Sequence, residues 1–278
     1  MDNRLTPSKL IFALFFCGLI ILSLMPIFWG MLASFRTETA LLAYPPTISN
    51  FDPTLENYRR IVDGGILVGV RNSLLYAAAS VVLGLILGSI AAFGFDRFQF
   101  AGKHGLFLIV VASIPLAIGS AALIVPTFLF FTALGFTNQW YTLPIIYGVH
   151  SLPMVIWILK GSLEGIPREL DEAAYVDGAS SMTVFFQIIL PLCKPALAAA
   201  GLFLFLHAWN EFLAGSVMVD PKDLKPIQVL IYQYMGFFGR EWGAITAAST
   251  LAILPVILIY MFFGRMLVSG LTRGSVKG

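Results

Sequence analysis

The charged residues of this chain are confined to short segments, and the long runs between them carry almost none. Asp, Glu, Lys and Arg are absent from residues 10–35, 72–95, 105–159 and 242–264, and from 195 to 219 the only charge is Glu211. A helix needs roughly 20 apolar residues to cross the hydrocarbon core of a bilayer. Each run is long enough to do so, and the chain is therefore predicted to fold within a membrane. Charged residues make up 12% of the whole, about half of the share that is usual in soluble domains.

The runs predict six spans, because 105–159 is long enough for two. The sequence Gly135-Phe136-Thr137-Asn138-Gln139 supplies the turn between them. The first run is expected to be a span and not a cleaved signal, since its apolar core is longer than the usual roughly 7–15 residues. We expect an all-α membrane protein with one domain, residues 1–278, and spans at roughly 10–35, 72–95, 105–134, 140–160, 192–217 and 242–264.

The distribution of Lys and Arg predicts the orientation of the chain. With the N-terminus inside, ten of these residues fall in cytoplasmic segments and seven in outer ones. Four of the outer seven lie in the long first loop, which counts less in the positive-inside rule. We therefore expect both termini in the cytoplasm. Residues 36–71 and 218–240 are then external, and 162–191 form the main inner loop.

The inner loop 162–191 is predicted to contain a short helix. Pro167 suits the first turn of a helix, where its missing donor costs nothing, and the acids that follow complement the positive helix end. Gly178 is expected to end the helix, because glycine readily takes the left-handed conformation found there. The predicted helix runs over about ten residues, from Arg168 to Asp177.

The surface of this helix suits contact with another protein. Ala173 and Ala174 are small, which lets a partner approach closely, and Glu172 offers it a carboxylate. The residues expected at the contact are Arg168, Glu169, Asp171, Glu172, Ala173, Ala174, Asp177 and Gly178. A solvated amphipathic helix without a partner would have the same composition, so physical reasoning alone leaves both interpretations open.

Glu211 is the only acid within a predicted span, where a charge is costly and usually faces a cavity or a partner. His207 lies four residues earlier and is expected on the same helix face. Asn210 and Trp209 are adjacent, and His150 in the fourth span is placed at a similar depth. Such a set would suit a sugar, either in the solute pathway or at its gate. The alternative is that Glu211 pins the fifth helix to another subunit by hydrogen bonds.

Catalysis is not expected of this chain. It has no G-x-x-x-x-G-K-[ST] phosphate loop, so it has no nucleotide site of its own. His207 and Glu211 could begin a zinc site, but a catalytic zinc needs three protein ligands and only His150 could complete the set. No H-E-x-x-H motif is present. We expect neither a metal nor a cofactor.

The inner loop resembles the EAA loop of ABC-importer permeases. Glu172-Ala173-Ala174 is followed after three residues by Gly178, and nine residues further on by Ile188-x-Leu190-Pro191. Three other stretches resemble the carbohydrate branch of these importers, specifically its MalG-type permeases. They are Asn57-Tyr58, Trp209-Asn210-Glu211-Phe212, and the ending from Gly270 to Gly278, which reads G-L-T-R-G-S-V-K-G.

This resemblance implies the fold of type I ABC importer permeases and a multi-pass place in the bacterial cytoplasmic (inner) membrane. It implies a non-catalytic subunit that pairs with a homologous MalF-type permease and with two ATPase subunits, which bind the ATP and Mg. It further implies an extracytoplasmic solute-binding protein, a sugar-like solute and surrounding membrane lipid, with no nucleic acid. The EAA loop would dock on an ATPase subunit, and Thr272, Arg273 and Lys277 of the tail would reach the ATPase pair. The alternatives are a polyamine- or phosphonate-type ABC permease and a secondary transporter.

Overall fold

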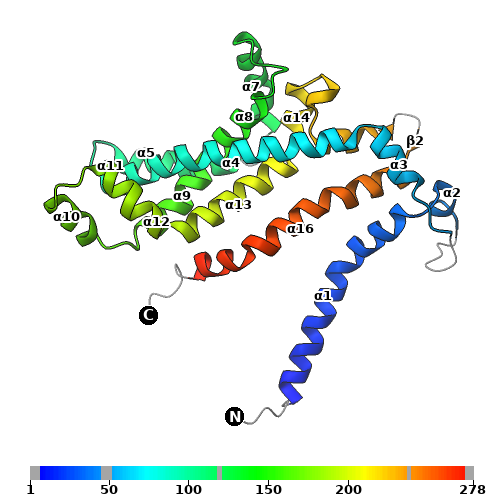
Figure 1. Ribbon diagram of the computed structural model, residues 1–278, viewed down its shortest axis with the longest axis horizontal. Helices are drawn as coiled ribbons and strands as arrows, with labels where there is room; N and C mark the ends of the chain where they lie inside the picture. Colours follow the sequence, from blue (N-terminus) through cyan, green and yellow to red (C-terminus); the bar gives the residue numbers. More distant parts are fainter. Residues whose placement is uncertain (1–6, 45–51, 118–120, 237–238, 273–278) are drawn as a thin grey trace. The chain divides into compact units, whose positions relative to one another are not determined.

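The chain is built almost entirely of helices (Figure 1). The computed structural model describes residues 7–44, 52–117, 121–236 and 239–272. The chain divides into two compact units. Unit 1 comprises residues 1–66 and 231–254, and unit 2 comprises residues 67–230 and 255–278.

Three helices of the described residues are each long and apolar enough to cross a membrane: α1 (Pro7–Ser34), α4 (Ile66–Arg97) and α16 (Trp242–Thr272). They correspond to the predicted spans 10–35, 72–95 and 242–264. Two further apolar segments pass the same test only as bent pairs. Helix α8 (Thr142–His150) meets α9 (Leu152–Leu163) at 46°, and Ser181–Leu192 meets α13 (Lys194–Asn210) at 79°. Length and composition thus support three spans, or up to five if each bent pair is one.

The predicted third span, 105–134, is not a single helix. It is divided among α5 (Lys103–Ala112), α6 (Ile114–Ala117) and α7 (Ala121–Ala133), and neither α5 nor α7 is long enough to cross a membrane alone. The first break lies at Ser113, two residues before Pro115. Proline has no amide hydrogen and its ring clashes with the preceding turn, so a helix tends to break there. The prediction of six spans is not confirmed.

The predicted fifth span, 192–217, is also interrupted. Helix α13 ends at Asn210, Glu211 has extended backbone with φ −72° and ψ 125°, and α14 (Leu213–Met218) follows. The expectation that His207 and Glu211 share one face of a continuous helix is therefore wrong. The interruption escaped the hydropathy argument because apolar residues flank it on both sides.

The core of unit 2 lies where α4, α9, α13 and the π-helix η1 (Val184–Ile189) meet. Gly84 and Gly88 of α4 let the neighbouring helices approach closely. A Cβ atom at Gly84 would lie 2.9 Å from Leu204 Cδ1, and one at Gly88 would collide with Val155. The buried cluster consists of Ala92, Phe93, Val155, Leu159, Leu163, Val184, Phe185, Ile189, Cys193, Ala196, Ala200 and Leu204.

Near the start of α4, side-chain hydrogen bonds hold residues 223–225, which follow α14 in the chain. Asn72 Nδ2 donates to the carbonyl oxygens of Asp223 and Lys225, at 2.7 and 3.1 Å. Tyr76 donates its hydroxyl proton to Leu224 O at 2.8 Å. The 3-10 turn η2 (Lys222–Leu224) and helix α15 (Ile227–Gln233) are thereby held at one end of the helices, while α10 (Glu169–Val176) lies at the other (Figure 1).

Unit 1 joins the end of α1 to three short elements and the start of α16. These elements are α2 (Glu38–Leu41), α3 (Glu56–Asp63) and the antiparallel pair β1 (Met235–Gly236) and β2 (Gly239–Arg240). Asn57, which belongs to the Asn57-Tyr58 stretch noted in the sequence, donates to the carbonyl oxygens of Ser34 and Arg36 at 2.9 and 2.7 Å. Glu38 accepts hydrogen bonds from the amides of Trp242 and Gly243. This caps the N-terminus of α16, where a carboxylate is favourable.

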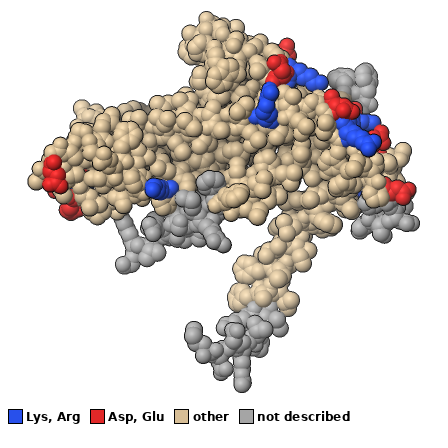
Figure 2. Space-filling view, viewed as in Figure 1, with Lys and Arg blue, Asp and Glu red and all other residues tan. Residues whose placement is uncertain are grey.

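The surface of unit 2 separates charged ends from an apolar middle. On the face shown in Figure 2, acidic side chains lie near α10, acidic and basic side chains gather near the chain that follows α14, and the helices between them show almost no charge. Large apolar side chains of α4, such as Leu75, Val82 and Ile86, are more than half exposed. Contiguous exposed apolar surface on this scale is expected of a protein that faces lipid.

Candidate functional site

The helix predicted in the inner loop is present as α10, shorter by one residue at each end than expected. Its C-terminus closes with paired hydrogen bonds, from Gly178 N to Tyr175 O at 3.0 Å and from Ala179 N to Ala174 O at 2.9 Å. Gly178 has φ +85°, the left-handed value that this closure requires. The glycine therefore ends the helix as the sequence indicated.

The outward face of α10 carries both carboxylates and large apolar side chains. Glu169, Glu172, Ala173, Asp177 and Gly178 of the predicted contact set are exposed. Leu170, Tyr175 and Val176 are also exposed, Val176 by 87%. The sequence prediction did not include these three apolar residues, although their polar surroundings in an inner loop were a signal for them. This face therefore combines an exposed apolar patch with surrounding carboxylates, and it lies outside the apolar middle of unit 2. Such a surface is typical of a contact with another protein.

Asp171 does not lie on this outward face. Its Oδ2 atom is 2.6 Å from Arg97 Nε, and Arg97 Nη1 is 2.7 Å from Asp96 Oδ2. The three side chains are each only 6–7% exposed. The expectation that Asp171 meets a partner directly is thus corrected: it holds α10 on the end of α4. Ala174 also faces inward and packs against the core cluster.

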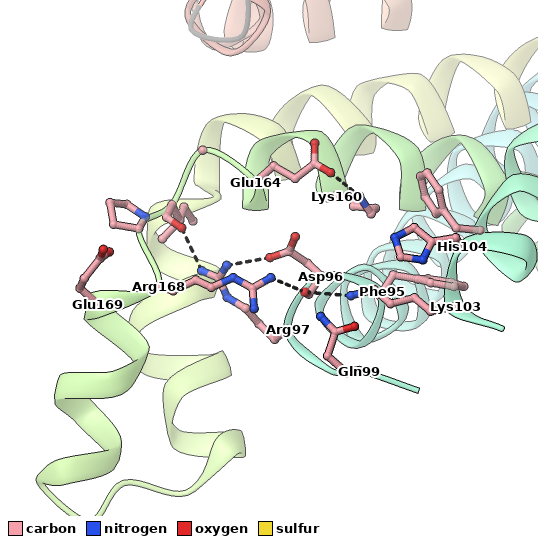
Figure 3. A pocket seen from close by; sticks show the side chains of 14 residues that line it. Phe95, Asp96, Arg97, Gln99, Lys103, His104, Lys160, Glu164, Arg168 and Glu169 are labelled. Atoms are coloured by element: carbon pink, nitrogen blue, oxygen red, sulfur yellow. Dashed lines mark hydrogen bonds and ion pairs between the residues drawn. The ribbon is translucent and has the colours of Figure 1, made fainter. Parts of the chain in front are cut away.

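Two further bonds tie the start of α10 to the end of α4 (Figure 3). Arg97 Nη2 donates to Ile166 O at 3.2 Å, and Arg168 Nη2 donates to Asp96 O at 3.0 Å. Asp96 and Arg97 are not among the residues predicted from the sequence to act at this site. Their signal was their position, as two adjacent opposite charges directly after the charge-free run 72–95.

The chain returns from α10 to the apolar helices through η1. Ser180 caps the short helix α11 (Ser181–Thr183), which directly precedes η1, by accepting a hydrogen bond from Thr183 N at 3.2 Å. Val184, Phe185 and Ile189 are buried in the core of unit 2. A π-helix is rare and often marks a functional segment. Pro191, which cannot donate a backbone hydrogen bond, lies two residues after the end of η1. The EAA-like loop is therefore continuous with the packed core.

Glu211 caps the short helix α14. Its carboxylate accepts hydrogen bonds from Ala214 N, at 2.9 and 3.1 Å to the two oxygens, and from Gly215 N at 3.2 Å. A carboxylate at a helix N-terminus is stabilised by the amides and by the helix dipole. The cost of placing this charge in an apolar stretch is thus offset within its own segment.

The other residues of the predicted membrane cluster have different surroundings. Trp209 is 1% exposed and belongs to the core, with its carbonyl oxygen accepting from Gln228 Nε2 at 3.2 Å. Asn210 is exposed, and its Nδ2 donates to Leu206 O at 2.8 Å, which satisfies a carbonyl near the end of α13. His207 is partly buried and stacks on Phe203.

The structure does bring His150, His207 and Glu211 together. The charge of Glu211 acts on both imidazoles, and the two imidazoles act on one another. Tyr147 of α8 is fully buried, and its hydroxyl makes no hydrogen bond of normal geometry. Among the described residues, no group of three or more His, Cys, Asp or Glu is placed to hold a metal ion.

The predicted tail contact lies largely beyond what the structure describes. Thr272 is the last residue of α16, and nothing is described of its side chain. Arg273 and Lys277 lie outside the described residues. Their expected contact with an ATPase pair stays a prediction.

Comparison with known proteins gives consistent matches. The sequence matches the family described as "Binding-protein-dependent transport system inner membrane component" over residues 84–273. It is 33% identical over 263 residues to the sulfoquinovosyl glycerol transport system permease protein SmoH of Agrobacterium fabrum, covering 94% of this chain and 91% of that protein. It is 31% identical over 264 residues to the trehalose/maltose transport system permease protein MalG of Thermococcus litoralis, covering 93% of each.

A solved structure shares the fold. A chain of a bacterial ABC transporter involved in the import of the acidic polysaccharide alginate is similar with a TM-score of 0.79. The match covers 95% of this chain and 99% of that chain at 20% sequence identity. The helical fold therefore resembles that of ABC importer permeases.

Proposed function

The chain belongs to the family of binding-protein-dependent transport system inner membrane components, and from this premise we propose that it is a permease subunit that moves a sugar or sugar derivative in a bacterial ATP-driven importer. The family supports a membrane-embedded subunit, and the relatives SmoH and MalG are named for sugar-type solutes. The chain itself is non-catalytic in this proposal. ATP and Mg are bound by ATPase subunits, and no cofactor belongs to the chain.

The observation that carries this proposal is how α10 is attached to the end of α4. Its outward face offers Glu172 and Val176 to an ATPase subunit, while its inward face is fixed to α4 through Asp171 and Arg97. A buried ion pair of this kind is costly to break once formed. A displacement of α10 by the ATPase would therefore displace the end of α4 as well. Helix α10 is thus proposed as the coupling element, with η1 passing the same movement to α13.

The orientation follows from this assignment. The end of unit 2 that carries α10 would lie on the cytoplasmic side, where ATP is available, and both termini would lie there too. The chain would cross the membrane six times, with 105–134 as a broken span. It would form the translocation pathway with a homologous MalF-type permease, and an extracytoplasmic binding protein would deliver the solute.

We assign the polar cluster around Glu211 to the pathway or its gate and not to the coupling element. The support is its composition: imidazoles of His150 and His207, the exposed amide of Asn210 and the capped carboxylate of Glu211 adjoin a break in the helix. Because the carboxylate is already bound to the amides of α14, its first role is to stabilise the break between α13 and α14. Trp209 supports the cluster from the core.

The experiment that tests this function is solute-dependent ATP hydrolysis by the assembled importer. The full chain is reconstituted in liposomes with its partner permease, ATPase and binding protein, and hydrolysis is measured with the binding protein loaded from panels of sugars and of polyamines. Stimulation by a sugar is expected, with accumulation of that sugar in the vesicles. Stimulation by polyamines alone would overturn the choice of solute, and hydrolysis without any transport would overturn the function.

A further inference from the structure

A cavity of about 740 Å³ lies beside α10 in unit 2, between the end of α4, the start of α5 and the end of α9 (Figure 3). Its lining includes Glu169 of the predicted contact set, but neither Glu172 and Val176 nor any residue of the cluster around Glu211. Its wall carries four cations and three carboxylates: Arg97, Lys103, Lys160 and Arg168, with Asp96, Glu164 and Glu169. The function proposed above assigns no ligand to this cavity.

The charges of this wall are not evenly paired. Arg97 is bound to Asp96 and Asp171, and Lys160 is paired with Glu164. Those two cations are therefore already balanced by neighbouring carboxylates. Arg168 and Lys103 remain, and they form no ion pair among the residues that the structure describes.

Lys103 and Arg168 instead converge on a single neutral acceptor. Lys103 Nζ donates to Asp96 O at 3.3 Å, and Arg168 Nη2 donates to the same oxygen at 3.0 Å. In Figure 3 both side chains reach this point, and Glu169 lies at the edge of the view, away from it. The carboxylate of Asp96 itself is paired with Arg97, so it forms no ion pair with either of these cations. A further anion between Lys103 and Arg168 would bind both by charge-assisted hydrogen bonds.

The position of the cavity points to the source of that anion. Lys103 is the first residue of α5, and one turn further on Leu106 is exposed, followed by the exposed Leu108 and Ile109. Lys160 lies near the end of the apolar helix α9, with its Nζ 4.6 Å from the centre of the Phe107 ring. Cations at the ends of lipid-facing helices lie at the depth of the headgroups, where anionic lipids attract them.

We propose that this cavity binds the phosphate of an anionic phospholipid, with Lys103 and Arg168 as its ligands and with the acyl chains along the apolar surface of α5. His104, which also lines the cavity, stands beside the same headgroup. Arg168 directly precedes α10, so a bound lipid would steady the start of the coupling helix. The lipid composition would then tune how firmly α10 is held when an ATPase docks.

The test is a binding titration on the purified full chain in a neutral detergent, without any ATPase. The probes are short-chain phosphatidylglycerol, phosphatidylcholine of the same chain length and inorganic phosphate, and bound lipid is counted by native mass spectrometry. Phosphatidylglycerol is expected to bind in preference to phosphatidylcholine. Lys103→Gln should weaken its binding about tenfold, the scale of one charge-assisted hydrogen bond. Lys103→Arg should retain it, and the exposed Lys222→Gln should leave it unchanged.

Four outcomes would overturn the proposal. The first is equal binding of the two lipids, and the second is an unchanged affinity in Lys103→Gln that has the size-exclusion profile of the unaltered chain. Inorganic phosphate that binds as tightly as the lipid and displaces it would make this a free-phosphate site. In a second assay, with the ATPase added to lipid-free Lys103→Gln, loss of ATPase docking would make the cavity a protein contact. None of these readings depends on which solute is transported.

Discussion

Arg97 and Asp171 join two segments that are far apart in the chain, with Arg97 Nε 2.6 Å from Asp171 Oδ2 and both side chains buried. Arg97 ends α4, and Asp171 lies in the first turn of α10. A charge buried with its counter-ion cannot be separated from it cheaply, because water no longer solvates either group. The end of a membrane helix and the proposed ATPase-docking helix therefore behave as one mechanical part.

Removal of the Asp171 carboxylate should weaken the attachment of α10 to the end of α4. We expect Asp171→Ala to destabilise the contact between α10 and α4 by about 1.5–3 kcal/mol, since Arg97 keeps Asp96 but loses one charged partner. Two measurements report the effect: the thermal unfolding of the detergent-solubilised chain and the protection of the α10 amides from hydrogen exchange. The triple variant Asp96→Asn, Arg97→Met and Asp171→Leu should recover much of the loss, because none of the three buried charges is then left without its partner. Equal stability of Asp171→Ala and the unaltered chain would contradict the role of the pair.

Local signals in the sequence predicted much of the fold. The charge-free runs correspond to α1, α4 and α16, and Gly178 ends α10 at φ +85°. Gly135 and Asn138 both have positive φ in the turn expected between the third and fourth spans. Each of these features depends on residues that are close together in the chain, which is why composition and spacing were enough to find it.

The features that sequence reasoning missed depend on distant partners or on backbone geometry. Asp171 turns inward because Arg97, 74 positions earlier in the chain, offers it a buried counter-ion. The break at Glu211 is invisible to hydropathy, because Phe212 and Leu213 continue the apolar run. The break at Ser113 did carry a local signal, because Pro115 follows two residues later and proline disfavours a continuous helix.

Reversal of charge on the outward face of α10 should weaken ATPase docking. We expect Glu172→Lys to reduce recruitment of the ATPase subunit about tenfold, since it replaces an exposed carboxylate at the proposed contact with a cation. Co-purification of the ATPase with the membrane subunits measures it. Because Lys is also unfavourable in the first turn of a helix, Glu172→Gln serves as the control for the helix itself. Glu56→Lys, an exposed change on α3, should leave docking intact. Normal recruitment by Glu172→Lys would remove α10 from the interface.

The turn after α10 should be sensitive to the loss of its glycine. Gly178→Ala is expected to cost about 1–2 kcal/mol, because an L-residue is strained at positive φ even though open space surrounds this position. Hydrogen exchange should then be faster at the amides of residues 178 and 179, which donate the two hydrogen bonds of the helix closure. Gly161→Ala is the matched control, since that glycine also has open space but lies within α9 at ordinary φ. A similar response of the two variants would mean that the left-handed turn does not stabilise α10.

Two variants of Glu211 can distinguish a structural role of its carboxylate from a role in transport. Its carboxylate accepts from the amides of Ala214 and Gly215, so Glu211→Leu should remove the cap of α14 and cost about 1 kcal/mol or more of local stability. We expect a lower yield of assembled complex from this variant. Glu211→Gln keeps one acceptor oxygen and the shape of the side chain but loses the charge that acts on His150 and His207.

Glu211→Gln should therefore assemble close to the unaltered level and still show changed ATP hydrolysis or uptake with loaded binding protein, if the carboxylate also serves the pathway or its gate. Complex yield and stimulated hydrolysis, measured together on both variants, separate the roles. A silent Glu211→Gln beside a poorly assembled Glu211→Leu would make Glu211 a cap alone. Full yield and full activity in both would mean that neither the cap of α14 nor the charge at this break matters to the importer.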